Sequence, residues 1–138
     1  MEIINELTAI GRVLQQKRDQ FLAPLGLKGI HGRILLEIGE HPGISQEGLV
    51  KYIKVDKSNI ARHVAALEQK GFVRRLPGET DRRSVNLFLT SQTEYLLPRL
   101  QKAMHGWESE LLRDLSRWEI SQLRGLLTRI LESAGEEN

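Results

Sequence analysis

The sequence predicts a mainly α-helical protein with one small β-hairpin, an α+β chain, and two observations carry this prediction. Apolar residues recur at steps of three and four over most of the 138 residues, which is the period of an amphipathic helix. Between residues 72 and 89 the pattern changes to the alternation typical of strands. With 40% hydrophobic and 28% charged residues, the chain has the composition of a folded domain. Its length fits one compact domain, or one domain with an appended oligomerisation element.

The first helix is expected over residues 2–22, and Pro24 and Gly26, which follow it, end the helix. A second helix is expected over residues 28–39, and the segment 40–43 stops it because it contains a proline and a glycine. The apolar positions of the first helix fall at near-heptad spacing: Ile3, Leu7, Ile10, Leu14 and Phe21.

A short third helix follows Ser45, which is a suitable N-cap, and Leu49 is its clearest buried residue. Asp56 or Ser58 then caps a fourth helix. Gly71 supplies the left-handed position that ends it, with Phe72 and Leu67 in contact as in a Schellman motif. The fourth helix has one buried stripe, made of Ile60, Val64 and Leu67.

Residues 72–76 and 83–89 are expected as the two strands of the hairpin, joined by a charged turn over residues 77–82. Thr90 or Ser91 then begins a long helix, in which Pro98 predicts either a kink or a late start. A capping box from Ser116 to Glu119 opens the last helix.

The helices at the two ends carry apolar stripes that a chain of this size usually buries against a second copy of itself. We therefore expect a homodimer. The alternative is an intramolecular bundle of the same three helices, namely the first helix, the long helix after the hairpin and the last helix. Heptad spacing alone does not distinguish such a bundle from a dimer.

Charge is concentrated in the middle of the chain. Residues 51–83 contain nine basic and four acidic residues, a net charge of +5, whereas the rest of the chain carries −3. Such a segment is typical of a surface that faces a polyanion. There is no cysteine, which excludes disulfides and thiolate metal sites, and the N-terminus has the pattern of neither a signal peptide nor a membrane span. We expect a cytoplasmic protein that does not insert into membranes.

The outward face of the fourth helix is polar and small, which suits close approach to DNA. Arg62 can contact a guanine edge in the major groove, while Ser58 and Asn59 can read neighbouring edges. Lys57, at the helix start, suits a phosphate. In the hairpin, Asp81 can hold the guanidinium of Arg82 or Arg83 extended toward a minor groove, and Arg74 and Arg75 are placed for phosphates.

Three segments resemble the MarR family of bacterial transcription regulators: Asp56 to Val64, Leu67 to Arg75, and Asp81 to Thr90. The last contains the most recognisable motif of the family, Asp-x-Arg followed by Leu-x-Leu-Thr. The resemblance implies a winged helix-turn-helix domain over residues 28–90 and dimerisation helices over residues 1–27 and 91–138. It also implies that Arg83 is the wing arginine, positioned by Asp81, with Arg82 a close second.

The resemblance further implies a repressor that a small anionic or phenolic effector releases from DNA. Candidate effector contacts are Arg12, Phe21, His31 and Arg33, although a histidine on a helix is more often structural. No cofactor or metal is expected, because the acidic and histidine residues have no zinc-site spacing.

We therefore predict a sequence-specific regulator that binds a pseudo-palindromic operator in double-stranded DNA. The alternative is a winged-helix module that binds proteins without reading DNA. We expect no enzyme, since the sequence has no phosphate-binding glycine loop and no nucleophile with a base motif.

Overall fold

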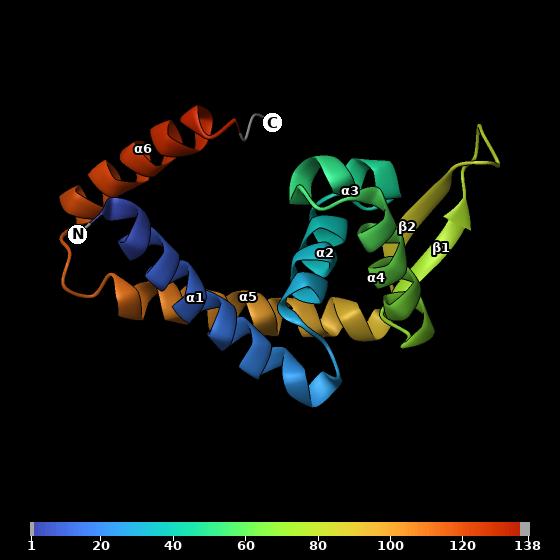
Figure 1. Ribbon diagram of the computed structural model, residues 1–138. Helices are drawn as coiled ribbons and strands as arrows, with labels where there is room; N and C mark the ends of the chain where they lie inside the picture. The colour runs from blue at the N-terminus through green and yellow to red at the C-terminus, as the bar shows by residue number, and fades with distance from the viewer. Residues whose placement is uncertain (1, 136–138) are drawn as a thin grey trace. The chain divides into compact units, whose positions relative to one another are not determined.

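The computed structural model describes residues 2–135 and contains seven helical elements and a two-stranded sheet in this part of the chain (Figure 1). The elements are α1 (Ile3–Leu22), η1 (Ala23–Leu25), α2 (Gly29–Glu40), α3 (Gln46–Ile53), α4 (Lys57–Gln69), β1 (Val73–Pro77), β2 (Val85–Leu89), α5 (Ser91–Leu111) and α6 (Arg117–Ser133). The predicted fold class is confirmed.

The chain divides into two compact units, Met1–Lys102 and Ala103–Asn138, and α5 contributes to both. The first unit contains α1 to β2, and the second contains the end of α5 and α6. The division of the chain into a DNA-binding part at residues 28–90 and dimerisation helices on either side stays a prediction.

Side-chain caps fix the starts of α3 and α4. Ser45 Oγ accepts a hydrogen bond from the backbone N–H of Gly48 at 3.0 Å. Asp56 Oδ1 accepts one from the backbone N–H of Asn59, also at 3.0 Å. Asp56 is thus the N-cap of α4, and Ser58 lies inside the helix. A cap of this kind satisfies one of the free N–H groups of the first turn.

The predicted end of α4 is confirmed in detail. Gly71 has a φ of +82°, which only glycine adopts without strain. The backbone N–H of Phe72 donates to Leu67 O at 2.9 Å and that of Gly71 to Glu68 O at 3.0 Å, the two bonds of a Schellman motif. The helix therefore stops where β1 must begin.

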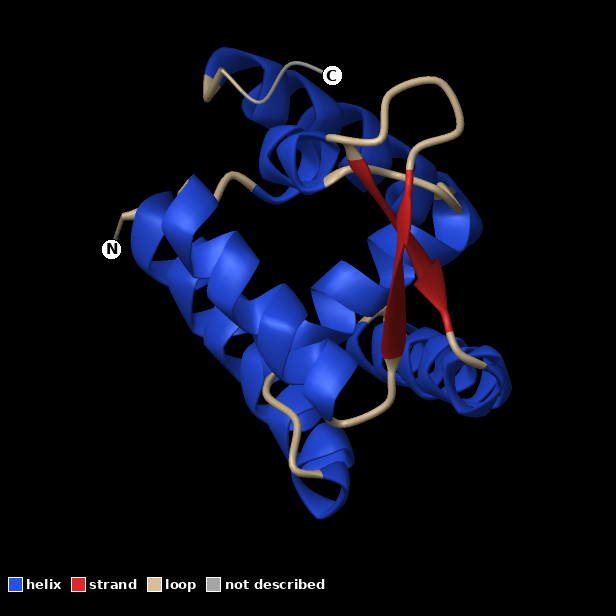
Figure 2. Cartoon of the chain, turned by 90° about the vertical axis from the view of Figure 1, so that its right-hand side faces the viewer, coloured by secondary structure: helices blue, strands red, loops and turns tan. Residues whose placement is uncertain are grey.

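The hairpin is antiparallel, with Val73 opposite Leu89 and Pro77 opposite Val85. Its loop projects away from the helices of the first unit (Figures 1 and 2). The expected second strand began at residue 83, and this was wrong: β2 begins at Val85, because the backbone of residues 83 and 84 bonds to Asp81 in a turn.

The middle of β2 is held by the segment that joins α2 to α3. The backbone N–H of Gly43 donates to Leu87 O at 2.8 Å, and the N–H of Leu87 donates to Ile44 O at 2.9 Å. Leu87 is fully buried. Strand β2 is therefore fixed to the helical part of the unit through its middle residue, and the loop lies beyond this attachment.

The hydrophobic core belongs to the first unit and joins α2, α3 and α4 to the hairpin and the start of α5. The predicted stripe of α4 and the predicted Leu49 lie fully inside it. The buried apolar residues are Leu22, Leu27, Ile34, Leu35, Ile38, Leu49, Ile53, Ile60, Val64, Leu67, Phe72, Val73, Leu87, Leu97 and Leu100.

Helix α5 begins at Ser91 and continues through Pro98, so a late start at the proline is excluded. Thr93, which is fully buried, donates from Oγ1 to Phe72 O at 2.7 Å and so connects the first turn of α5 to the hairpin. The capping box of α6 is confirmed: Ser116 N–H donates to Glu119 Oε1 at 2.8 Å, and Glu119 N–H donates to Ser116 Oγ at 3.1 Å.

The apolar stripes of α1 and α6 remain exposed within one chain. Trp118 is 70% exposed and Ile3 is 69% exposed. Among the described residues of the second unit, 103–135, no side chain is fully buried. A pair of helices without a core of its own is unusual for a folded unit and indicates that another surface covers it. In the part of the chain that the structure describes, no helix combines the length and apolar character needed to cross a bilayer.

Candidate nucleic-acid interface

The start of α4 carries a chain of hydrogen bonds between two predicted interface residues, Asn59 and Arg62, and the cap Asp56. Asp56 Oδ2 accepts from Asn59 Nδ2 at 2.6 Å, in addition to the backbone bond through Oδ1. Asn59 Oδ1 in turn accepts from Arg62 Nη2. Because residues three apart lie on the same face of a helix, the chain runs along one side of α4.

The outward face of α4 is as the sequence predicted. Ser58 and Arg62 are exposed, and Asn59 is half-buried. Lys57 is also exposed, and its Nζ lies 3.6 Å from Glu47 Oε1 on α3. An exposed pair of this kind contributes little to stability, so the lysine remains available to an anion.

The loop between the strands, residues 78–84, is the wing loop, and hydrogen bonds close it. Asp81 Oδ1 accepts from the backbone N–H of Arg83 at 3.0 Å. Ser84 donates from Oγ to Asp81 O at 2.7 Å, and the N–H of Gly78 donates to Ser84 O at 3.0 Å. Arg82 and Arg83 are exposed at the tip.

The expected role of Asp81 is corrected by this geometry. Within the described residues, its carboxylate binds the backbone of Arg83 and forms no ion pair with the guanidinium of Arg82 or Arg83. A short carboxylate bonds most readily to an N–H two residues on, as in an Asx turn. Asp81 therefore fixes the path of the main chain, and the arginine side chains extend from it.

The two arginines of β1 differ in their surroundings. Arg74 is exposed, whereas Arg75 is half-buried with its Nε 3.5 Å from Glu68 Oε1 on α4. Arg74 is thus open to a phosphate, and Arg75 links the strand to α4.

Comparison with known proteins agrees with this geometry. The model of the MarR family matches residues 31–85, which include α3, α4 and most of the hairpin. The chain is 30% identical over 129 residues to YybA, an uncharacterised HTH-type transcriptional regulator of Bacillus subtilis (strain 168), and the match covers 94% of this chain and 86% of YybA. The chain belongs to the MarR family. It is accordingly a DNA-binding transcription regulator of the winged-helix type.

Solved structures of MarR proteins share the fold over nearly the whole chain. The transcriptional regulator SlyA is 28% identical with a TM-score of 0.92, and the match covers 99% of this chain and 96% of SlyA. A MarR-type protein from Listeria monocytogenes, crystallised with a 26-mer DNA, is 24% identical with a TM-score of 0.89, and covers 96% of this chain and 89% of its own. MarR proteins act as dimers, and the exposed stripes of α1 and α6 fit that assembly.

Behind the interface of this MarR protein lies a pair of histidines. His31 on α2 is 5% exposed, and its Nε2 lies 3.3 Å from Nδ1 of His63 on α4, with the rings edge to face. His31 Nδ1 accepts from the backbone N–H of Lys28 at 2.9 Å. Because Nδ1 accepts, neutral His31 carries its proton on Nε2 and donates it to His63. Both ring nitrogens of His31 are therefore used within the protein, which leaves neither for an effector.

The pair favours the uncharged state. Burial, reinforced by His63, Lys70 and Lys28, lowers the pKa of His31 to about 4. Burial, followed by Arg62 and Lys28, also lowers the pKa of His63. The histidines thus hold α2 against α4 in their neutral form.

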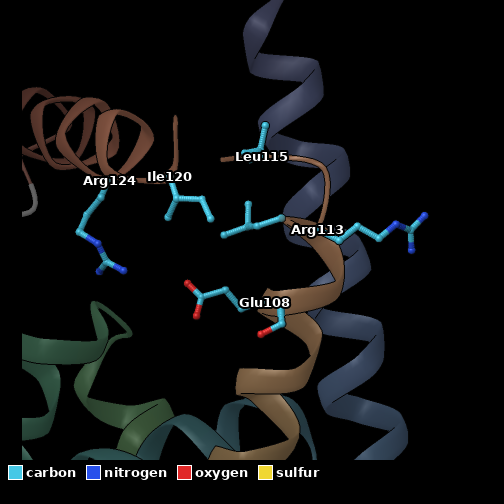
Figure 3. A pocket seen from close by; sticks show the side chains of 7 residues that line it. Glu108, Arg113, Leu115, Ile120 and Arg124 are labelled. Carbon is cyan, nitrogen blue, oxygen red and sulfur yellow. The ribbon is translucent and has the colours of Figure 1, made fainter. Parts of the chain in front are cut away.

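The other candidate effector contacts differ in their exposure. Arg12 and Arg33 are exposed, and Phe21 is half-buried. A separate cavity of about 360 Å³ lies within the second unit, lined by Glu108, Ser109, Leu112, Arg113, Leu115, Ile120 and Arg124. Glu108 and Arg124 extend into the space between the two helices, while Arg113 points away (Figure 3). None of the four candidates lines this cavity.

Sequence reasoning missed Gly78 and Ser84, which close the wing loop. A Cβ on Gly78 would lie 2.2 Å from Ser84 Oγ and 2.6 Å from Asp81 O, so no other residue fits there without opening the loop. The Pro77-Gly78 pair is a turn signal, but it does not show which residues meet across the turn. Among residues 2–135, no three histidine or acidic side chains gather as metal ligands do.

Proposed function

We propose that this MarR protein is a sequence-specific repressor that binds a pseudo-palindromic operator as a homodimer and leaves it when a small anionic or phenolic effector binds. One observation carries the DNA-binding part: the exposed Arg62 on α4 and the closed, arginine-tipped wing loop belong to one compact unit with a common core. An α-helix fits the major groove, and an arginine loop beside it suits the minor groove.

The symmetry of the operator follows from the dimer. Two copies related by a two-fold axis place two α4 helices on one face of the duplex, about 34–36 Å apart. The operator is then an inverted repeat whose half-sites lie about one helical turn apart. The crystallised complex of the Listeria monocytogenes protein with a 26-mer DNA, a length that could hold two such half-sites, supports this proposal.

The effector part rests on the chemistry of the dimerisation helices. The cavity of the second unit combines Arg124 and Glu108 with apolar Leu112, Leu115 and Ile120, so an anion with an apolar body would bind on the side of Arg124, away from the Glu108 carboxylate. An effector acts by favouring a dimer in which the spacing of the two α4 helices does not match the groove. We propose no catalytic role, and we propose that the protein acts in the cytoplasm, where its DNA is.

The test is selection of bound duplexes from genomic DNA by the purified protein at two salt concentrations. The wild type should enrich an inverted repeat. Arg62→Ala should relax one base position in each half-site, at about 1–3 kcal/mol. Arg83→Ala should lower enrichment throughout, because it removes the minor-groove contact. Arg99→Ala, an equal loss of charge at an exposed position of α5, is the matched control and should select the wild-type sequence.

Retention without a sequence pattern, lost on adding salt, would contradict the proposal, since it is the behaviour of phosphate binding alone. The protein-binding alternative then becomes the better reading. For the effector part, salicylate is a suitable probe because it carries both a carboxylate and a phenol. Release of the enriched duplex by salicylate, but not by benzyl alcohol at the same concentration, is the expected result.

A further inference from the structure

The cap of α4 does two separate things with its two carboxylate oxygens. Oδ1 of Asp56 accepts the backbone N–H of Asn59, which is the ordinary task of an N-cap. Oδ2 accepts a side-chain N–H of the same residue at 2.6 Å. The second bond adds nothing to capping, because serine or threonine caps a helix with a single oxygen.

The second bond decides which way the amide of Asn59 points. A carboxylate only accepts hydrogen bonds, so the amide must turn its Nδ2 toward Asp56. Turned the other way, Asn59 would place Oδ1 against Oδ2, two acceptors with no proton between them. The amide oxygen therefore faces along the helix, where it accepts from Nη2 of Arg62.

This orientation leaves Arg62, and not Asn59, with the free groups needed to contact a base. Reading adenine requires an asparagine that offers both its oxygen and an N–H to one base. In Asn59 the oxygen is bound to Arg62 and one N–H to Asp56. Arg62 uses only one of its five N–H donors to bind Asn59. The exposed guanidinium therefore has enough free N–H donors to bind the two acceptors of guanine.

We propose that Asp56 is a positioning residue for sequence specificity: through the amide of Asn59 it holds the guanidinium of Arg62 ready for one guanine in each half-site. The inference rests on the proposed function, in which α4 lies in the major groove. It assigns Asn59 to supporting Arg62 rather than to reading a base of its own.

Two replacements of Asp56 separate positioning from capping. Asp56→Ser keeps one cap oxygen and loses the acceptor for the Asn59 side chain. Asp56→Asn keeps a cap oxygen but presents an NH₂ group, which turns the amide of Asn59 round and sets its own NH₂ against Arg62. Asn59→Ala breaks the chain with the cap untouched. Asp114→Asn, a loss of the same charge at an exposed residue outside α4, is the matched control.

The experiment compares the base preferences of these variants by selection from a randomised half-site library, with thermal unfolding of each variant alongside. Arg62→Ala first locates the guanine position. At that position we expect Asp56→Ser, Asp56→Asn and Asn59→Ala each to lower the preference for guanine about tenfold, with the remaining positions and the unfolding temperature close to wild type. Asp114→Asn should keep the full preference.

Two results would overturn the inference. If Arg62→Ala relaxes a guanine position while the Asp56 and Asn59 variants keep it, the chain of bonds does not set specificity, although the proposed function stands. If Asn59→Ala relaxes a separate adenine position, Asn59 reads a base itself. A selection in which Arg62→Ala has no effect overturns the proposed reading by α4 as well, so the two failures are distinguishable.

Discussion

His31 links the stability of the fold to pH because burial lowers its pKa from the ordinary value of 6.5 to about 4. The folded state binds the proton of His31 more weakly than the unfolded state does. The contribution of neutral His31 to the free energy of unfolding is therefore complete above pH 6.5 and is lost as the pH falls from 6.5 toward 4. Between pH 7 and pH 5 this group should remove about 2 kcal/mol from the free energy of unfolding.

The measurement is urea unfolding at pH 7 and pH 5, at one fixed protein concentration. His31→Asn keeps an acceptor for the N–H of Lys28 and removes the titrating group, so its loss between the two pH values should be smaller by that amount. His105→Asn, at an exposed position of α5, should keep the wild-type loss. An equal loss in all three proteins would show that His31 does not carry the effect.

Lys54 is the one non-glycine residue with positive φ in the described chain, with φ of 60° and ψ of 37° at the end of α3. A left-handed backbone conformation costs a residue with a Cβ about 1–2 kcal/mol. Glycine avoids this cost, but its greater freedom in the unfolded chain offsets part of the gain. Lys54→Gly should therefore stabilise the protein, by about 0.5–1 kcal/mol in urea unfolding.

The same substitution three residues earlier provides the control. Lys51 lies inside α3, so Lys51→Gly should destabilise by about 1 kcal/mol. Two lysine-to-glycine changes of opposite sign would identify backbone conformation as the cause. A loss of stability in both would refute it.

At the scale of elements, the wing loop should depend on Gly78. Alanine at this position meets Ser84 Oγ at 2.2 Å and the carbonyl of Asp81 at 2.6 Å, so the loop has to open. The core lies elsewhere, and we expect little change in unfolding temperature. Operator affinity should fall about tenfold, or ~1.4 kcal/mol, because the arginines at the tip are no longer held.

Fluorescence anisotropy with a labelled operator measures this loss. Thr80→Ala, exposed in the same loop, should bind like the wild type. If Gly78→Ala binds equally well, closure of the loop is irrelevant to DNA binding.

The sequence predicted those elements whose ends are set by neighbours in the chain. The cap at Asp56, the Schellman end at Gly71 and the capping box at Ser116 are local signals, and all three are confirmed. The start of β2 was misplaced because the alternating pattern continues into residues whose backbone is held by Asp81. For Pro98 the sequence left a kink and a late start open, and the structure excludes the late start because tertiary contacts, such as that of the buried Thr93, fix the first turn of α5 ahead of the proline.

The candidate interface was predictable only as a set of residues. Spacing places Asp56, Asn59 and Arg62 on one side of α4, but the orientation of an amide depends on acceptor geometry that a sequence does not contain. His31 and His63 are 32 residues apart, and only the packing of α2 on α4 brings them together.

At the scale of the whole molecule, the exposed stripe of α6 should determine whether the protein can occupy an operator. Ile130 is 46% exposed in one chain and lies on that stripe. Ile130→Glu places a charge where a second copy should bury an apolar side chain. We expect monomers in analytical ultracentrifugation, and loss of operator binding because one half-site alone holds the protein weakly.

Gln122→Glu adds the same charge to an exposed polar position of α6 and should remain dimeric with normal affinity. A dimer that persists in Ile130→Glu would place the contact between copies elsewhere on the chain.

The attachment of β2 through the bonds of Leu87 to Gly43 and Ile44 also bears on the entropy of binding. Ordering the backbone of one residue costs about 1–2 kcal/mol, so a loop of five unrestrained residues at the tip would lose roughly 5–10 kcal/mol on meeting the duplex. In this protein the bonds among Gly78, Asp81 and Ser84 already restrict residues 79–83 before DNA is present. If the arginines at the tip contact DNA as proposed, we therefore expect most of the free energy of those contacts to appear as affinity, because little of it is needed to immobilise the loop.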